Sequence, residues 1–333
     1  MSRSTTLRSD LLLLLAAVIW GFAFVAQRMG MVHIGPFMFN AIRFALGAGV
    51  MLVVIKGREV WKTVGREECK TIGQEDGRSE RPEELQTADR RLTTNDYRLT
   101  TIYGVLLGLI LFAGATFQQA GIVHTTAGNA GFITGLYIIL VPIFGIFSGH
   151  KTGTNVWGGA VIAMVGLYFL SVTESFTISK GDSLVLIGAI FWAIHVLYTG
   201  WLSPRMSALR LAATQYIVCS VLSLFSALIF EDNTLSGIYK AGIPLLYGGL
   251  LSVGVAFTLQ IVGQKKAPPA HAAIILSLET VFAVIGGVLI LSETMTERKW
   301  FGCSLMLAGM LLAQVSRRSS VSNQQSMTIN DNQ

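Results

Sequence analysis

The sequence predicts an all-α membrane protein with ten transmembrane helices in two inverted five-helix repeats, and three observations carry this prediction. The first is composition: the 333 residues are 52% hydrophobic and only 13% charged, with a mean hydropathy of +0.58. The second is a succession of apolar stretches of membrane-spanning length. The third is an internal repeat. A chain so poor in charge lacks the solvated surface that a soluble enzyme needs.

Residues 56–98 carry a large share of the charge, with 10 Lys or Arg and 10 Asp or Glu among them. The remaining 290 residues hold 24 charges, about 8%. We expect the segment to be a charged cytoplasmic insertion, solvated and partly disordered, although it could bind a regulator. No basic stripe with interleaved aromatic residues accompanies the pI of 9.3, so nucleic acid is not an expected partner.

Polar or turn-forming residues separate the apolar stretches, and Pro268-Pro269 is one such separator. The first stretch could be a cleaved signal peptide, but it passes Trp20 without an A-x-A-like site, which favours a signal anchor. The predicted spans are 11–30, 36–55, 99–121, 126–148, 154–172, 183–202, 209–230, 242–263, 270–291 and 299–316.

Basic residues outside the insertion predict the orientation. Nine lie on the side that carries the N-terminus and five on the other, so both termini are expected in the cytoplasm. The predicted organisation is a cytoplasmic arm (1–10), a first repeat (11–172), a second repeat (182–316) and a cytoplasmic polar tail (317–333).

The second half of the chain repeats the first. The segment Asp10 to Trp20 matches Asp182 to Trp192 at an offset of 172, and Gln118 matches Gln260 at an offset of 142. Because each unit has five spans, an odd number, the second copy enters the membrane from the opposite side. Inverted repeats of this kind allow inside-open and outside-open states to arise from one architecture.

Several short motifs recur in order along both halves of the sequence, namely Trp20-Gly21-Phe22, Ile42-Arg43-Phe44, Ala127 to Leu136, Phe191-Trp192-Ala193, Ser277 to Ala283 and Leu291-Ser292-Glu293. Across about residues 10–316 they resemble the EamA repeat of the drug/metabolite transporter superfamily. The resemblance implies a ten-helix carrier with a central cavity, usually an exporter of small metabolites. Thr280 stands where the family often has proline, and Ser292 where a glycine usually precedes the next Glu.

Three ionisable residues are predicted at membrane depth, where charge is costly and suggests function. Arg43 could bind a substrate carboxylate or phosphate, or could balance Glu279. Glu279 could couple transport to protons. The alternative for both is a structural salt bridge or polar pair between helices. For His195 the alternative is a simple hydrogen bond to a neighbouring backbone or hydroxyl group.

Uncharged residues are also candidates for cavity lining or coupling, namely Trp20, Gln118, Asn129, Tyr137, Trp192, Gln215 and Gln260. The alternative is that the Trp side chains face lipid or pack in the core. At 100° per residue, Asn129 and Tyr137 share one side of the fourth span, away from Gly128, Gly131 and Gly135. Pro142 is expected to kink this span.

The sequence therefore predicts an integral membrane transporter, in a bacterial inner (plasma) membrane, that moves a small metabolite by alternating access, with export as the expected direction. Expected partners are a small-molecule substrate, membrane lipid, a proton or solute gradient and a second copy in a homodimer. No cofactor, metal or catalytic residue is expected, because no Walker or hydrolase motif is present. The alternatives are a non-transporting sensor or scaffold, or an intramembrane enzyme.

Overall fold

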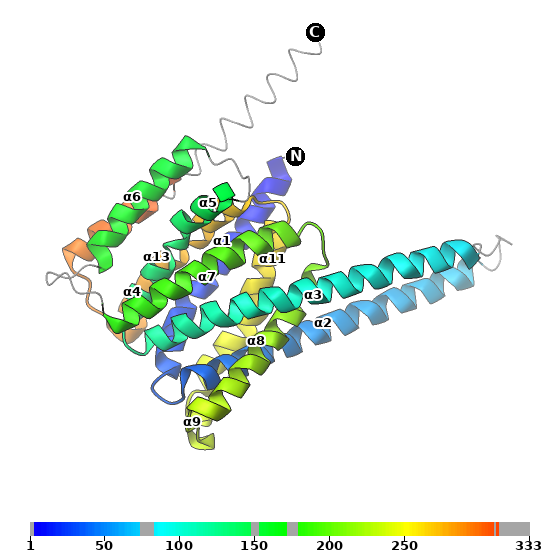
Figure 1. The fold of residues 1–333 in the computed structure, drawn as a ribbon, viewed down its shortest axis with the longest axis horizontal. Helices are drawn as coiled ribbons and strands as arrows, with labels where there is room; N and C mark the ends of the chain where they lie inside the picture. Colours follow the sequence, from blue (N-terminus) through cyan, green and yellow to red (C-terminus); the bar gives the residue numbers. More distant parts are fainter. Residues whose placement is uncertain (1–2, 74–82, 148–152, 172–178, 310, 313–333) are drawn as a thin grey trace, which may run out of the picture.

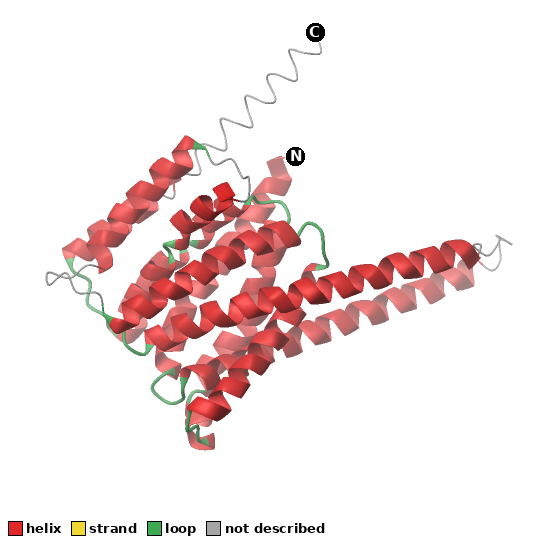
Figure 2. Ribbon diagram, in the orientation of Figure 1, coloured by secondary structure: helices red, strands yellow, loops and turns green. Residues whose placement is uncertain are grey.

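The chain forms a bundle of helices in a computed structural model (Figures 1 and 2). The structure describes residues 3–73, 83–147, 153–171, 179–309 and 311–312, and no strand occurs among them. Its first half consists of α1 (Arg3–Gly30), α2 (Pro36–Gly73), α3 (Glu83–Ile122), α4 (Ala127–Thr134), α5 (Tyr137–Phe147) and α6 (Thr154–Ser171). Its second half consists of α7 (Lys180–Leu202), α8 (Ala208–Phe230), α9 (Leu235–Lys240), α10 (Gly242–Leu246), the π-helix η1 (Tyr247–Phe257), α11 (Thr258–Gln264), α12 (Pro269–Leu276), α13 (Glu279–Leu291) and a helical stretch over 297–309.

Eight segments are long and apolar enough to cross a membrane, which confirms the predicted all-helical membrane class. They are Leu7–Gly30, Pro36–Arg58, Tyr97–Ile122, Ala127–Phe147, Lys180–Leu202, Ala208–Phe230, Gly242–Gln264 and Pro269–Leu291. In α6 the apolar stretch Trp157–Gly166 is shorter.

The apolar surface of α8 shows why lipid is its solvent. Val221, Phe225 and Leu228 follow one another at helical spacing and are 59%, 64% and 72% exposed. On the other side of the same helix, Cys219 and Ser223 are fully buried. A helix that exposes its large apolar side chains and buries its small and polar ones is stable only where the exposed face meets hydrocarbon.

The described parts of the 56–98 insertion are helical, whereas the sequence predicted a solvated loop. α2 continues to Gly73 and α3 begins at Glu83, and the two helices project together beyond the rest of the bundle (Figure 1). The cause lies in composition, since Glu, Lys, Arg and Gln are good helix formers and continue the helices of the adjacent spans. The prediction of partial disorder stays untested for the centre of the insertion, because residues 74–82 lie outside the described residues.

Two spans are interrupted at equivalent positions. Gly135 and Leu136 separate α4 from α5, and Ser277 and Leu278 separate α12 from α13, 142 residues later. The local hydrogen bonds also correspond, because the Leu136 and Leu278 peptide N–H groups each donate to the carbonyl three residues earlier, at 3.2 Å. The two halves therefore share a backbone irregularity that the sequence repeat alone did not reveal.

Neither interruption lies at a proline. Pro142, the expected kink, lies inside α5, and Thr280 occupies the position where the resemblance led us to expect proline. In the ninth span, hydroxyl groups bond carbonyls at the tightened turn: Ser277 Oγ donates to the Ile274 oxygen at 2.8 Å, and Thr280 Oγ1 donates to the Ser277 oxygen at 2.9 Å. Such side-chain bonds stabilise a break without proline.

Helices of the two halves pack directly against each other, above all α2 with α8, α3 with α7 and α8, and α1 with α13. Glycines permit the close approach. A Cβ added at Gly21 of α1 would lie 2.7 Å from the carbonyl oxygen of Glu279, and one added at Gly108 of α3 would lie 2.7 Å from Val218 Cβ. The interface between the halves is thus a tightly packed part of the fold.

Ser292, which ends α13, is the one non-glycine residue with a positive φ in the described part of the chain, at 54°. The Glu293 peptide N–H then donates to the Gly287 oxygen at 3.0 Å, closing the helix end as in a Schellman motif. This turn directs Glu293 back towards α4.

Replacing Ser292 with Gly is expected to raise the free energy of unfolding by about 0.5–1 kcal/mol, because glycine adopts this backbone conformation without steric cost. Thermal unfolding of the purified protein in detergent micelles measures the change. Ser292→Ala, which keeps a Cβ, is the control and should give no gain. Equal stability of the Gly and Ala variants would show that the left-handed turn is not strained.

Candidate functional site

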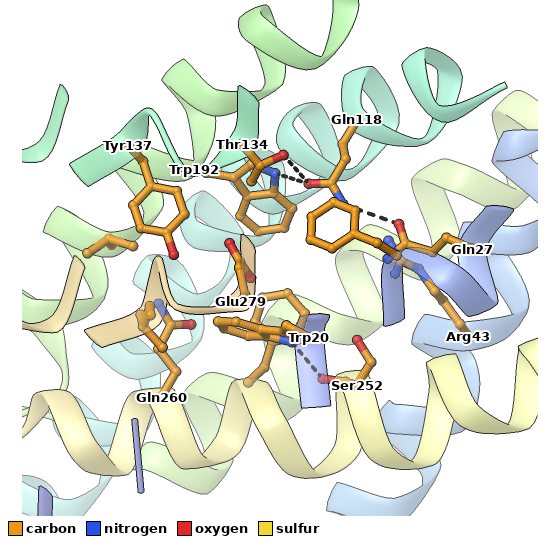
Figure 3. Close-up of a pocket in the computed structure, with 14 residues that line it drawn as sticks. Trp20, Gln27, Arg43, Gln118, Thr134, Tyr137, Trp192, Ser252, Gln260 and Glu279 are labelled. Carbon is orange, nitrogen blue, oxygen red and sulfur yellow. Dashed lines mark hydrogen bonds between the residues drawn. The ribbon is translucent and has the colours of Figure 1, made fainter. Parts of the chain in front are cut away.

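A cavity of about 40 Å³ lies between the two halves and has room for a few water molecules (Figure 3). Its walls are mostly apolar, with a small number of polar groups, as is usual for small-molecule sites. The lining residues are Trp20, Phe24, Gln27, Arg43, Gln118, Thr134, Tyr137, Trp192, Val196, Ser252, Phe257, Gln260, Leu276 and Glu279.

Most of this lining consists of residues at equivalent positions of the two halves. The offset of 172 pairs Trp20 with Trp192 and Phe24 with Val196, and the offset of 142 pairs Gln118 with Gln260, Thr134 with Leu276 and Tyr137 with Glu279. The repeat therefore relates the opposite walls of the cavity to each other.

Arg43 is a buried cation without a carboxylate partner among the described residues. It is 3% exposed, its Nε donates to Asn40 Oδ1 at 3.0 Å, and no described carboxylate oxygen lies within 4.0 Å of its guanidinium group. Instead the guanidinium carbon lies 4.9 Å from the centre of the Phe44 ring and 5.8 Å from that of Phe39. Aromatic faces compensate only part of a buried charge, which leaves Arg43 able to bind an anion.

Glu279 is the first residue of α13 and is 5% exposed. At the interruption before it, the peptide N–H groups of Thr280 and Val281 donate to the carbonyl oxygens of Ser277 and Leu278, at 3.1 and 3.0 Å. Tyr137, its equivalent, begins α5 in the same way. The Tyr137 hydroxyl faces the Glu279 carboxyl group (Figure 3) but has no hydrogen-bond partner among the described residues.

Gln118 connects four helices. Its Oε1 accepts a hydrogen bond from Trp192 Nε1 of α7 at 2.6 Å and a longer one from Thr134 Oγ1 of α4 at 3.5 Å, while its Nε2 donates to Gln27 Oε1 of α1 at 3.2 Å (Figure 3). Trp20, the equivalent of Trp192, donates from Nε1 to the backbone oxygen of Ser252 in η1 at 3.1 Å.

Phe257 lies between the two tryptophans. Its ring centre is 4.6 Å from that of Trp20, edge to face, and 5.8 Å from that of Trp192, where the rings stack. Aromatic pairs at these distances are favourable. Flat aromatic faces and one buried cation can together hold a small solute with an anionic group.

Two carboxylates of the second half bind the helices of the first half at one end of the bundle. Glu231 accepts from the peptide N–H groups of Phe37 and Met38 at the start of α2, at 2.7 and 2.9 Å. Glu293 accepts from those of Ala127 and Gly128 at the start of α4, at 2.9 and 3.2 Å. Charged caps of this kind are strong hydrogen bonds, so they join the two halves firmly at this end.

At the opposite end, Asp10 of α1 pairs with His271 of α12 at 2.9 Å, and Arg210 of α8 bonds the hydroxyl of Tyr97. These two contacts also join the first half to the second. Polar contacts between the halves are therefore present at both ends. Among the described residues, the two carboxylates that cap helices of the other half, Glu231 and Glu293, lie at the same end.

The structure brings seven of the ten predicted site residues together in the cavity, namely Trp20, Arg43, Gln118, Tyr137, Trp192, Gln260 and Glu279. His195 and Gln215 lie outside its lining and bond each other, Nε2 to Oε1, at 2.9 Å. Asn129 also lies outside, half-buried in α4. Its predicted alignment with Tyr137 assumed an uninterrupted helix, and the turn at Gly135 and Leu136 breaks that geometry.

Sequence reasoning missed seven lining residues: Phe24, Gln27, Thr134, Val196, Ser252, Phe257 and Leu276. Helical spacing could have identified two of them, since Phe24 and Gln27 follow Trp20 at i+4 and i+7 on one face of α1. The repeat then leads from Phe24 to Val196. Ser252 and Phe257 belong to a π-helix, whose register no simple periodicity predicts.

Within the described residues, no group of three or more His, Cys, Asp and Glu side chains is placed to hold a metal ion. The structure is that of an integral multi-pass membrane protein with a cavity between two related halves. This combination defines a membrane transporter as the class of protein.

The chain belongs to the EamA-like transporter family, whose model matches residues 7–172 and 179–314, so that two EamA domains cover nearly the whole chain. The family consists of membrane transporters, which favours transport over the sensor, scaffold and enzyme alternatives. The predicted resemblance is confirmed.

Curated relatives agree with this assignment. An "Uncharacterized transporter" of Archaeoglobus fulgidus is 30% identical, over 93% of this chain and 86% of its own length. The "Uncharacterized inner membrane transporter YedA" of Escherichia coli strain K12 is 22% identical, over 90% and 88%. The "Threonine/homoserine exporter RhtA" of Salmonella typhimurium is 27% identical, over 50% of this chain and 56% of its own length.

A solved crystal structure shares the fold. It covers 96% of this chain and 99% of its own, with a TM-score of 0.68 and 17% sequence identity. The likeness extends over the whole helical bundle.

Proposed function

We propose that the protein is a secondary transporter that exports a small metabolite by alternating access. The observation that carries the proposal is the cavity between the two halves, whose walls are equivalent residues of the two EamA domains. In this proposal ten spans cross the membrane, the fifth and tenth in α6 and in the 297–309 helix. The halves are inverted, and both termini lie in the cytoplasm, as the distribution of basic residues predicts.

With this orientation, the end held by Glu231 and Glu293 faces outward. The carboxylate caps keep that end closed, and the cavity of about 40 Å³ is smaller than a metabolite. The structure then corresponds to an outward-closed state with a contracted site. Binding of cargo requires the halves to separate, which is what alternating access provides.

For the cargo we propose a small amino acid. Arg43 offers a guanidinium group without a carboxylate partner among the described residues, and a guanidinium fork matches a free carboxylate. Glu279 offers a carboxyl group for the ammonium end. The name of the Salmonella relative, a threonine/homoserine exporter, supports the same class of cargo.

Coupling of export to a proton gradient follows from the binding of the cargo's ammonium group to Glu279. If a proton and the cargo's ammonium group both bind Glu279, they cannot do so together, because one carboxylate carries one charge. Proton entry would then alternate with amino-acid exit. A gradient of protons could drive export through this single side chain without a nucleotide site.

Arg43→Gln is expected to weaken threonine binding about tenfold or more, because a charged hydrogen bond to the carboxylate is lost. Efflux of radiolabelled threonine from proteoliposomes over a range of concentrations measures it. Arg43→Lys keeps the charge and should retain part of the flux. Arg205→Gln, an exposed position outside the cavity, is the control for general loss of charge. An unchanged concentration dependence in Arg43→Gln would refute the carboxylate role.

Glu279→Gln is expected to abolish the acceleration of threonine efflux by an imposed proton gradient, since the amide neither binds a proton nor carries charge. Efflux measured with and without the gradient, in matched vesicles, gives the ratio directly. Glu297→Gln, an exposed change on the neighbouring helix, should keep the wild-type ratio. A full gradient response in the Glu279 variant would place coupling elsewhere. If the wild type moves no threonine, metabolites accumulated by cells with and without the protein identify the cargo instead.

A further inference from the structure

A hydrogen bond that joins the two halves has no counterpart at the equivalent position. Trp192 Nε1 donates to Gln118 Oε1 across the cavity at 2.6 Å. The repeat relates Trp192 to Trp20 and Gln118 to Gln260, so an equivalent bond would run from Trp20 to Gln260. Instead, Trp20 Nε1 donates to the Ser252 backbone oxygen at 3.1 Å, and Gln260 Oε1 is buried without a hydrogen-bond partner.

We propose that the Trp192–Gln118 and Trp20–Gln260 bonds are alternative closing contacts, formed in opposite facing states of the transporter. The inference rests on the proposed alternating access by inverted halves. When two inverted halves exchange conformations, a contact made by one set of residues in one state is made by the equivalent set in the other. Trp20 therefore moves from Ser252 to Gln260 as Trp192 leaves Gln118.

The unpartnered oxygen of Gln260 is the second observation behind this proposal. Gln260 is 1% exposed and lines the cavity, and a buried amide oxygen without a donor is unfavourable. The nearby indole of Trp20 belongs to the same lining and carries the donor that this oxygen lacks. In the opposite state Gln260 gains a donor, while Gln118 Oε1 keeps only the longer bond from Thr134.

Phe257 couples the positions of the two indoles over a short distance. Both indoles contact its ring, Trp20 at 4.6 Å and Trp192 at 5.8 Å, so a shift of one indole changes the space available to the other. The Ser252 backbone oxygen, which accepts from Trp20, has an equivalent in the first half that lies in a different kind of helix. Ser252 lies in the π-helix η1, whereas its equivalent, Ile110, lies in the regular helix α3.

The opposite state is then not identical to the described one. A carbonyl of a regular helix accepts from the N–H four residues on, and one of a π-helix from the N–H five residues on, so the oxygens of Ile110 and Ser252 lie in different helical registers. The state described by the structure satisfies both indole N–H groups.

The test measures from which side of the membrane the cavity is reached and requires no cargo. Leu276, a fully buried residue of the lining, is replaced by Cys in a chain whose Cys69, Cys219 and Cys303 are changed to Ser or Ala. A membrane-impermeant maleimide is added to right-side-out and to inside-out vesicles. The ratio of the two labelling rates reports the balance of the two states.

Gln118→Leu and Gln260→Leu are expected to shift this ratio in opposite directions, each by about threefold to tenfold, the effect of one hydrogen bond. Trp192→Phe should shift it in the same direction as Gln118→Leu. The Gln118→Leu/Trp192→Phe double variant should shift it no further than the larger single variant, because both changes remove the same bond. Gln119→Leu is the matched control, since Gln119 is buried outside the lining and its repeat equivalent is Ile261.

The proposal is overturned if Gln118→Leu and Gln260→Leu shift the ratio in the same direction, or if neither exceeds Gln119→Leu. Should Gln118→Leu fail to reach the membrane, Trp192→Phe tests the same bond with a smaller change. Labelling from one side alone in the wild type and every variant would overturn alternating access itself. Same-direction shifts with labelling from both sides would leave alternating access intact and reject only the exchange.

Discussion

Polar groups at membrane depth must find their partners inside the protein, because hydrocarbon offers none, and in this chain many of them lie between the two halves. Trp192 bonds Gln118 and Trp20 bonds the Ser252 carbonyl, each across the two halves, whereas His195 bonds Gln215 within the second half. The outer surfaces of the helices are left apolar. A cavity with polar walls consequently lies where the halves meet, and their relative position determines which polar groups are paired.

The two halves share much of their backbone, with the π-helix η1 as an exception, and they differ in the chemistry of the cavity. Tyr137 and Glu279 begin equivalent helices after equivalent interruptions, yet one has a phenol and the other a carboxyl group. Arg43 corresponds to Gln215, which is paired with His195 rather than exposed to the cavity. The repeat therefore makes two related states possible, and in the proposed function Arg43 and Glu279 supply the affinity for a cargo.

Much of the fold and about half of the cavity lining could be predicted from the sequence. Physical reasons explain both this success and the residues that were missed. Lipid requires long apolar stretches, so helix positions were readable, and the repeat pointed to Trp20, Trp192, Gln118 and Gln260. Helical projection failed for Asn129 because α4 ends before Tyr137, and no residue type announces a break without proline. The α2 and α3 extensions were missed because charge was interpreted as loop, although charged residues form helices well.

Residues such as Phe24 and Val196 could not be distinguished from lipid-facing positions by composition, because apolar side chains serve both surfaces equally. Ser252 and Phe257 depend on the register of η1, which packing determines. His195 and Gln215 satisfy each other only because α7 and α8 lie side by side, a tertiary fact. The candidate site is thus predictable where the repeat identifies a residue, and less so where packing alone does.

The central claim is that the two ends of the bundle open reciprocally around one cavity. Distances between pairs of spin labels, measured by double electron–electron resonance on protein in lipid nanodiscs, test it directly. One label pair joins Val32 to Leu235, exposed at the end held by Glu231, and another joins Leu7 to Ser207, exposed at the opposite end. On a change of state, the account predicts that one distance lengthens while the other shortens. Lengthening of both together, or a single fixed distance at each end with and without amino acid, would contradict it.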